Sequence, residues 1–355
     1  MEAEVKILLK ILGERGDQRL LGEPFDSEKL IRLAEMHRVT YQLYVFAQGH
    51  PGIFNISQTT MLADRCRNSA LWSLAQLQEL IRIAGAFHQA GIPVVVIKGP
   101  QLSRMVHGRE ALKESVDLDF LLVHDTDLER AHILLTGAGY TQSNLNAHPG
   151  KLSRKIFLIA KREVHYFNPR NKSHIDLHAR AGANTYLTDG LFRHVFDDRE
   201  TFDLDGQPVT IFAREQYLVY LCYHGALHQF SRLGWLMDIR AFVLAYQDVM
   251  DYGKTISLAR KSKSETCLFL AFSLLEKYFD DNVPDVLKQV MPRNNRFNFL
   301  VSSCYKMLSR EPGYGLTLAG RANKLFYMMR LIDNIPGRLD LLYGISIRFV
   351  SKFFR

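Results

Sequence analysis

The sequence predicts an α+β protein in which a mixed sheet with flanking helices lies between two helical regions. Two observations carry this prediction. Short apolar runs that suit buried strands gather in the middle of the chain. Before and after them, apolar residues recur at a spacing near 3.6, as in amphipathic helices. We therefore expect an N-terminal helical region over 1–88, an α/β core over 89–213 and a C-terminal helical domain over 214–355.

The predicted core begins with a run of β-branched residues. Residues 93–97 read PVVVI, and Lys98, Gly99 and Pro100 follow them. β-branched residues favour strands, and a Lys-Gly-Pro sequence favours a turn. We expect a buried strand that turns sharply at Gly99 and continues into a helix that Gly108 ends.

Two acids interrupt the second apolar run of the core. Residues 116–123 read VDLDFLLV, and side-chain alternation along a strand puts Asp117 and Asp119 on one face, about 7 Å apart. Burying a carboxylate is costly unless a cation meets it. Two carboxylates from one rigid element suit Mg²⁺, which also binds substrate phosphates. The alternative is that both acids lie at an exposed strand end and form ion pairs with Lys113 or a neighbouring arginine.

After the D-x-D run, Thr126 and Glu129 form a capping-box pattern before a helix expected over 128–136. Three β-branched and aromatic segments follow, the last two joined as a hairpin by an Asn-Pro-Arg-Asn turn: 155–160, 164–169 and 173–179. A second hairpin is expected around the Asp205-Gly206 pair, because Asp-Gly between alternating runs favours a tight turn.

The last strand of the first hairpin, SHIDLHA, carries a third acid. His174, Asp176 and His178 share one face of it. Together with His165 on the preceding strand, they form a candidate zinc site, because imidazole and carboxylate are ordinary zinc ligands. Alternate positions on one strand are about 7 Å apart, which suits a tetrahedral zinc site poorly.

The order of strand, Lys-Gly turn, helix, D-x-D strand and later acid-bearing strand resembles the polymerase-beta-like nucleotidyltransferase superfamily. More narrowly it resembles the bacterial proteins labelled nucleotidyltransferase family protein, over roughly residues 25–246. This resemblance implies that Asp117 and Asp119 bind two Mg²⁺ ions, with Mn²⁺ as a substitute. It also implies that Asp176, on the neighbouring strand, completes the metal site and takes the proton from the attacking hydroxyl.

The same resemblance implies an NTP substrate. Lys98 and the backbone near Gly99 are expected to hold its triphosphate, with Lys113 and His178 as further contacts. Two positions depart from the usual pattern. Pro100 stands where the superfamily usually has Ser, and Lys113 stands where the narrower family commonly has Arg.

Three hypotheses for function follow from these residues. The first is a Mg²⁺-dependent nucleotidyltransferase that transfers NMP to an unidentified acceptor, which is a small molecule, a peptide, a sugar or an RNA. The second is a metal-dependent hydrolase that uses His224, His228 and Asp238, which resemble the family's H-x-x-x-H and L-x-W-x-x-D segment. The third is a nucleotide-binding protein without turnover.

The composition says more about the cellular compartment of the protein than about its activity. The net charge of +8 is spread along the chain, without the Lys/Arg runs and interleaved aromatic residues of RNA-binding proteins. The 4 cysteines are far apart and form no C-x-x-C pair, which fits a reducing compartment. The N-terminus does not look like a signal peptide, and no apolar run is long enough to span a membrane. We expect a soluble cytoplasmic protein.

Overall fold

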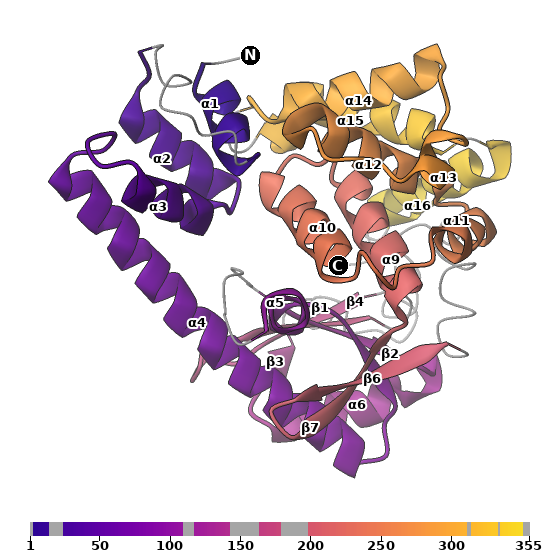
Figure 1. The fold of residues 1–355 in the computed structure, drawn as a ribbon. Helices are drawn as coiled ribbons and strands as arrows, with labels where there is room; N and C mark the ends of the chain where they lie inside the picture. The colour runs from indigo at the N-terminus through magenta and orange to yellow at the C-terminus, as the bar shows by residue number, and fades with distance from the viewer. Residues whose placement is uncertain are drawn as a thin grey trace. The chain divides into compact units, whose positions relative to one another are not determined.

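The computed structural model describes residues 3–13, 24–108, 117–142, 163–178, 198–310, 314–332 and 334–350. The chain divides into two compact units, and each unit combines segments from separate parts of the sequence (Figure 1). We call them the helical unit, made of residues 1–71, 218–259 and 264–333, and the sheet unit, made of residues 72–217, 260–263 and 334–355.

The helical unit joins N-terminal helices to helices from the second half of the sequence. Its N-terminal helices are α1 (Ala3–Leu12), α2 (Ser27–Met36), α3 (Thr40–Gly49) and the start of α4 (Ile56–Gln89). Its later helices are most of α9 (Arg214–Leu227), then α10 (Leu233–Ala245), most of α11 (Tyr252–Lys261), α12 (Glu265–Phe279), α13 (Asp285–Lys288), α14 (Asn295–Met307) and α15 (Leu318–Leu331). Helix α1 packs against α2, α3 and α12, so helices far apart in the sequence build one core.

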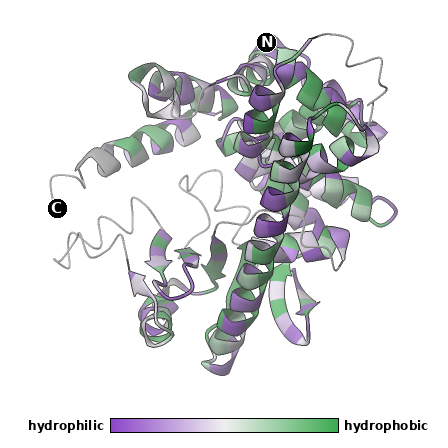
Figure 2. Cartoon of the chain, turned by 90° about the vertical axis from the view of Figure 1, so that its left-hand side faces the viewer, coloured by the Kyte–Doolittle hydropathy of each residue, from purple (hydrophilic) through white to green (hydrophobic). Residues whose placement is uncertain are grey.

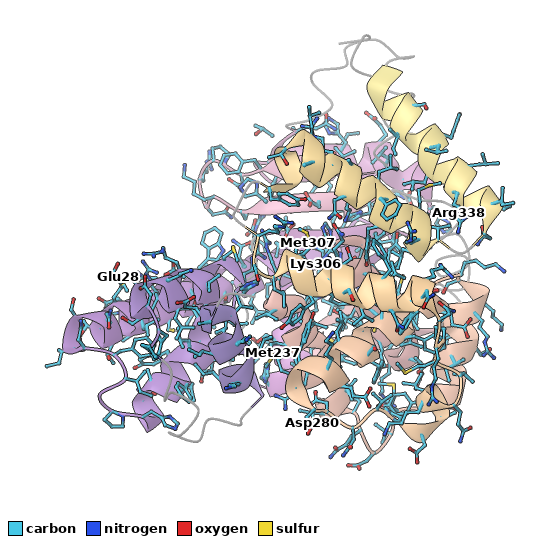
Figure 3. All side chains as sticks on the ribbon, turned by 90° about the horizontal axis from the view of Figure 1, so that it is seen from above. Glu28, Met237, Asp280, Lys306, Met307 and Arg338 are labelled. Atoms are coloured by element: carbon cyan, nitrogen blue, oxygen red, sulfur yellow. The ribbon has the colours of Figure 1, made fainter. Side chains whose placement is uncertain are left out.

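Two aspartates mark helix ends in this unit. Asp26 caps α2 by accepting a hydrogen bond from the backbone N–H of Lys29. Asp280 ends α12 in the left-handed region, with φ 57° (Figure 3). Hydrophobic and hydrophilic residues are interspersed along the described helices (Figure 2). None of these helices is long and apolar enough to cross a membrane.

The sheet unit is built on a mixed five-stranded sheet with the order β1-β2-β5-β4-β3. Strands β2 and β5 are parallel, and the other neighbouring pairs are antiparallel. The elements of this unit besides the end of α4 are β1 (Val94–Lys98), α5 (Pro100–His107), β2 (Leu118–Leu122), α6 (Leu128–Gly137), β3 (Thr141–Gln142), β4 (Glu163–Phe167), β5 (His174–His178), β6 (Arg199–Leu204), β7 (Gln207–Phe212) and α16 (Ile335–Val350). The predicted α+β class with a mixed sheet is confirmed.

The turn from β1 into α5 follows the prediction. Gly99 occupies the N-cap of α5 with φ 134°, a conformation that residues with a Cβ rarely adopt. Pro100 stands at the start of the helix, where its missing N–H leaves no helical hydrogen bond unmade. Gly108 ends the helix. Gly99 is therefore the single residue that connects the first core strand to the helix.

Both predicted hairpins are confirmed. Strands β4 and β5 pair across the turn that begins at Asn168, whose side chain accepts a hydrogen bond from the N–H of Arg170. Strands β6 and β7 form a separate two-stranded sheet. Asp205 and Gly206 make its turn, both with positive φ, as a two-residue hairpin loop requires. The strand predicted over 155–160 lies outside the described residues.

Helix α6 begins differently from the prediction. A short 3₁₀ turn over Asp125–Asp127 precedes it, and Asp127 is the N-cap, without a side-chain hydrogen bond to the helix backbone. The predicted capping box of Thr126 and Glu129 is therefore wrong. The Asp127 carboxylate instead accepts a hydrogen bond of 2.7 Å from the Arg130 guanidinium and forms an ion pair with it.

Candidate active site

One row of side chains crosses four strands of the sheet. Lys98 on β1 pairs with Asp119 on β2, Asp119 pairs with Asp176 on β5, and Asp176 pairs with His165 on β4. A bulge in β1 between Val96 and Lys98 brings Lys98 into this row. Strand pairing therefore sets a cation, two carboxylates and an imidazole next to one another.

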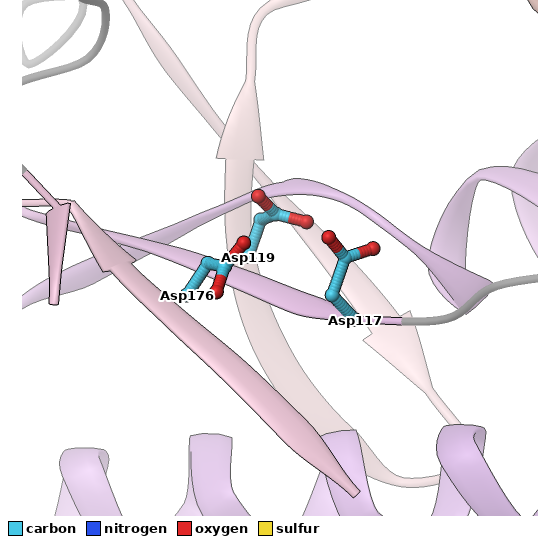
Figure 4. A group of neighbouring side chains, drawn as sticks. All are labelled: Asp117, Asp119 and Asp176. Carbon is cyan, nitrogen blue, oxygen red and sulfur yellow. The ribbon is translucent and has the colours of Figure 1, made fainter. Parts of the chain in front are cut away.

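Three carboxylates converge on this row (Figure 4). Asp117 precedes β2, and one oxygen from each of Asp117, Asp119 and Asp176 lies within 4.8 Å of the other two. Asp119 is 1% exposed, and the other two acids are partly buried. Among the residues that the structure describes, this is the one group of three or more acidic, histidine or cysteine side chains able to hold a metal ion. The structure thus brings together the three acids that the sequence analysis singled out.

Lys98 supplies the positive charge beside these acids. Its ammonium contacts the Asp119 carboxylate and lies 3.6 Å from Oδ2 of Asp117. Burial lowers the pKa of Lys98, but the charges of Asp119 and Asp117 outweigh burial and hold that pKa above its usual value. Burial raises the pKa of Asp119, and attraction by Lys98 with a hydrogen bond from His178 outweighs it, so this pKa is lowered. Both groups are charged at neutral pH.

His178 lies on the other side of Asp119. Its Nε2 is 3.0 Å from Oδ1 of Asp119. Burial lowers the pKa of the His178 imidazole, but the hydrogen bond and the charge of Asp119 outweigh it, and the net shift is upward. The sequence analysis expected a phosphate contact from Lys98 and His178. Both have a carboxylate contact here, and their contact with a phosphate stays a prediction.

Strand β4 adds two side chains that the sequence analysis did not assign to the nucleotidyltransferase site. Nδ1 of His165 lies 2.5 Å from Oδ1 of Asp176. Glu163 lies two residues earlier on the same face, with its carboxylate 3.6 Å from Nε2 of His165 and 3.9 Å from Nδ1 of His178. A signal for Glu163 is present in the sequence, because hairpin pairing across the Asn168 turn sets Glu163 opposite His178.

The remaining predicted site residues have different settings. Gly99 forms the turn at the end of β1, next to Lys98. Lys113 lies outside the described residues. His174 is exposed, and its ring lies 4.8 Å from that of Phe167. The candidate zinc site of His165, His174, His178 and Asp176 does not form in the described residues. The group there that could hold a metal ion consists of the three aspartates.

The histidines of the alternative hydrolase site pack around a tryptophan. The rings of His224 and His228 are 4.8 Å apart, and that of Trp235 lies 5.7 Å from the first and 4.9 Å from the second. Asp238 follows on α10. All of these residues are described, yet they form no group able to hold a metal ion. The two histidines at i and i+4 pack against each other and against Trp235.

A comparison with protein families matches most of the chain. The family model described as an uncharacterised nucleotidyltransferase covers residues 23–280. This range includes the acid-bearing strands β2 and β5 and the helices α9 and α10. No curated protein and no solved structure matches the chain.

Proposed function

Because the chain belongs to this family of uncharacterised nucleotidyltransferases, we propose that it transfers a nucleoside monophosphate from an NTP to a hydroxyl or phosphate group of an acceptor. The observation that carries the proposal is the convergence of Asp117, Asp119 and Asp176, with carboxylate oxygens within 4.8 Å of one another. Three carboxylates this close repel one another strongly unless cations lie between them. A divalent ion is the cation that nucleotide chemistry provides.

The donor set fits Mg²⁺ or Mn²⁺. All three side chains offer hard oxygen ligands, and none offers the sulfur or nitrogen that zinc prefers. Asp117 and Asp119 would hold two ions, and Asp176 would share one of them. Bound there, the metal supplies neutralisation of the phosphate oxygens and a lower pKa for an attacking hydroxyl.

The protein's own residues have separate roles in the proposed reaction. The acceptor oxygen forms a bond to the α-phosphorus of the NTP, and the bond from that phosphorus to the pyrophosphate oxygen breaks. Asp176 accepts the proton of the acceptor hydroxyl, and pyrophosphate leaves with the bonding electron pair. Lys98 and the backbone at Gly99 would hold the triphosphate, with Lys113 in the same role from its place in the family pattern.

The test is transfer of a labelled phosphate. We would incubate the full chain with each NTP labelled at the α-phosphate, with Mg²⁺ or Mn²⁺ and with fractionated cell extract as the source of acceptors. Expected are label in one acceptor fraction, release of pyrophosphate, and loss of both in Asp119→Asn. Asp248→Asn changes an exposed aspartate outside the site and serves as the matched control.

Two results would contradict the proposal. Transfer that persists in Asp119→Asn would remove the acid triad from the reaction. Nucleotide binding by calorimetry without pyrophosphate release, in every extract fraction, would favour a nucleotide-binding protein without turnover. The second result has a specific observation behind it, because Pro100 offers neither an N–H nor a hydroxyl to a phosphate at the turn.

A further inference from the structure

We infer that Glu163 and two histidines, His165 and His178, position the carboxylates of the acid triad. The inference rests on the proposed function and deepens it, since it assigns roles to side chains that neither bind the metal nor react. It concerns the face of β4 and β5 that carries Asp176.

The five side chains alternate between carboxylate and imidazole. From Asp176, the first contact is 2.5 Å to Nδ1 of His165, and Nε2 of the same ring lies 3.6 Å from Glu163. From Glu163, the next step is 3.9 Å to Nδ1 of His178, and Nε2 of that ring lies 3.0 Å from Asp119. Each imidazole thus contacts an acid of the triad with one nitrogen and faces Glu163 with the other.

An imidazole placed in this way resists rotation. Its two nitrogens lie at different edges of the ring, so turning the ring toward another partner gives up one carboxylate or both. The distances to Glu163 exceed hydrogen-bond length, so Glu163 acts on both rings through its charge. In metal sites generally, hydrogen bonds to the ligating carboxylates fix the orientation of the ligand oxygens.

The two acids depend on the histidines to different degrees. Asp119 is held from two sides, by the ammonium of Lys98 and by His178. Asp176 receives its side-chain hydrogen bond from His165. Loss of the His165 imidazole should therefore disturb Asp176 more than loss of the His178 imidazole disturbs Asp119. Asp176 is also the residue proposed to take the acceptor proton, so this disturbance should lower kcat.

The test measures the affinity for Mn²⁺ alone, by calorimetry or electron paramagnetic resonance, in the full chain without nucleotide. In His165→Ala we expect weaker Mn²⁺ binding by about 10-fold or more, as for loss of outer hydrogen bonds in other metal sites. Glu163→Gln keeps the shape and removes the charge, and should weaken binding less. His178→Ala should also have a smaller effect than His165→Ala.

Rescue separates positioning from general damage. In His165→Asn, the amide N–H can take the place of Nδ1–H, and Mn²⁺ affinity should return most of the way to the wild-type value. His174→Ala, at the exposed start of the neighbouring strand β5, is the matched control and should bind Mn²⁺ like the wild type. Where NTP transfer is measured, kcat should fall in His165→Ala while KM for the NTP changes little.

Wild-type Mn²⁺ affinity in both His165→Ala and Glu163→Gln would overturn the inference. If His165→Ala fails to fold, the closely shaped variants Glu163→Gln and His165→Asn decide, because positioning predicts a loss in the first and near-normal affinity in the second. The Mn²⁺ titration needs no substrate. A protein that loses Mn²⁺ affinity in these variants but transfers no nucleotide would disprove the proposed function and leave the positioning role standing.

Discussion

Asp119 and Asp176 lie side by side at paired positions of two parallel strands, β2 and β5. Adjacent strands are about 4.8 Å apart, so two carboxylates in this register repel each other unless positive charge lies beside them. In the described residues, Lys98 provides that charge by contacting the carboxylate of Asp119. The register of the sheet therefore creates both the demand for a cation and the place where a metal ion would meet it.

Replacing Lys98 should separate metal binding from catalysis. In Lys98→Met the ammonium no longer competes for Asp119 and Asp117, so we expect Mn²⁺ to bind several-fold more tightly. We also expect the rate of nucleotidyl transfer to fall by about 100-fold, because a cation that would hold the triphosphate is lost. Metal titration and a transfer assay measure the two effects. Lys172→Met changes an exposed lysine and should alter neither, and weaker Mn²⁺ binding in Lys98→Met would contradict the prediction.

A buried histidine should make the protein sensitive to mild acid. His37 is 0% exposed, with Nε2 3.1 Å from the carbonyl of Leu308, and Nδ1 accepts a hydrogen bond from the N–H of Leu233. Burial lowers the pKa of His37 from 6.5 to about 4. The unfolded chain therefore binds a proton at a higher pH than the folded chain. The free energy of unfolding should decrease by up to about 3 kcal/mol as the pH falls from 6.5 to about 4.

Urea unfolding at a series of pH values tests the role of His37. The variant His37→Gln keeps a donor and an acceptor but does not titrate, so its free energy of unfolding should change less between pH 6.5 and 4. His88→Gln, at an exposed position near the end of α4, should keep the wild-type dependence. Equal pH slopes in His37→Gln and the wild type would assign the acid sensitivity to other groups.

Gly225 in α9 leaves room for an aromatic ring. A Cβ at this position would lie far inside contact distance of the fully buried Phe230 ring. We expect Gly225→Ala to lower the free energy of unfolding by roughly 1–3 kcal/mol, because a packed core does not accept the extra atom without displacement. Urea unfolding monitored by circular dichroism measures the change. Gly49→Ala, where nothing lies within 4 Å of the added Cβ, is the control and should cost nothing measurable.

The hydroxyl of Tyr140 connects α4 to the hairpin of β4 and β5. It donates a hydrogen bond of 2.6 Å to Glu79 and lies 2.6 Å from Oγ of Ser173, in a side chain that is 1% exposed. Tyr140→Phe should lower the free energy of unfolding by about 1–3 kcal/mol, since it leaves buried partners without the hydroxyl. Tyr343→Phe, at a position that is 61% exposed, is the control. Unchanged stability in Tyr140→Phe would mean that water replaces the hydroxyl.

Local patterns in the sequence predict much of the fold. The β-branched run before Lys98, the glycine at position 99 and the Asp205-Gly206 pair each have a conformational preference that neighbouring residues do not oppose. The two acids of the D-x-D run are visible for the same reason, since charged residues in an apolar strand are unusual. These features depend on residues close in the sequence, and the structure keeps all of them.

Local sequence patterns do not predict the contacts between segments that are far apart in the sequence. Nothing in α1 indicates that it packs against α12, because amphipathic faces are interchangeable at the level of pattern. The contact of Lys98 with Asp119 joins residues from different strands and depends on an irregular pairing. The part played by Glu163 needs the register of three strands together. Sequence reasoning identified the triad acids and singled out Lys98 and His178, while the carboxylate contacts of these two residues and the place of Glu163 required the structure.

The bulge in β1 decides which side of the sheet receives the lysine ammonium. In an uninterrupted pleat, Lys98 would share the face of Val96, whose partner Phe120 is fully buried. The irregularity between the two positions reverses this parity and turns residue 98 toward the acids. A variant with the same strand length but without the bulge would therefore point the lysine away from the acids. The extra residue of the bulge must be kept for the ammonium to lie beside the carboxylates.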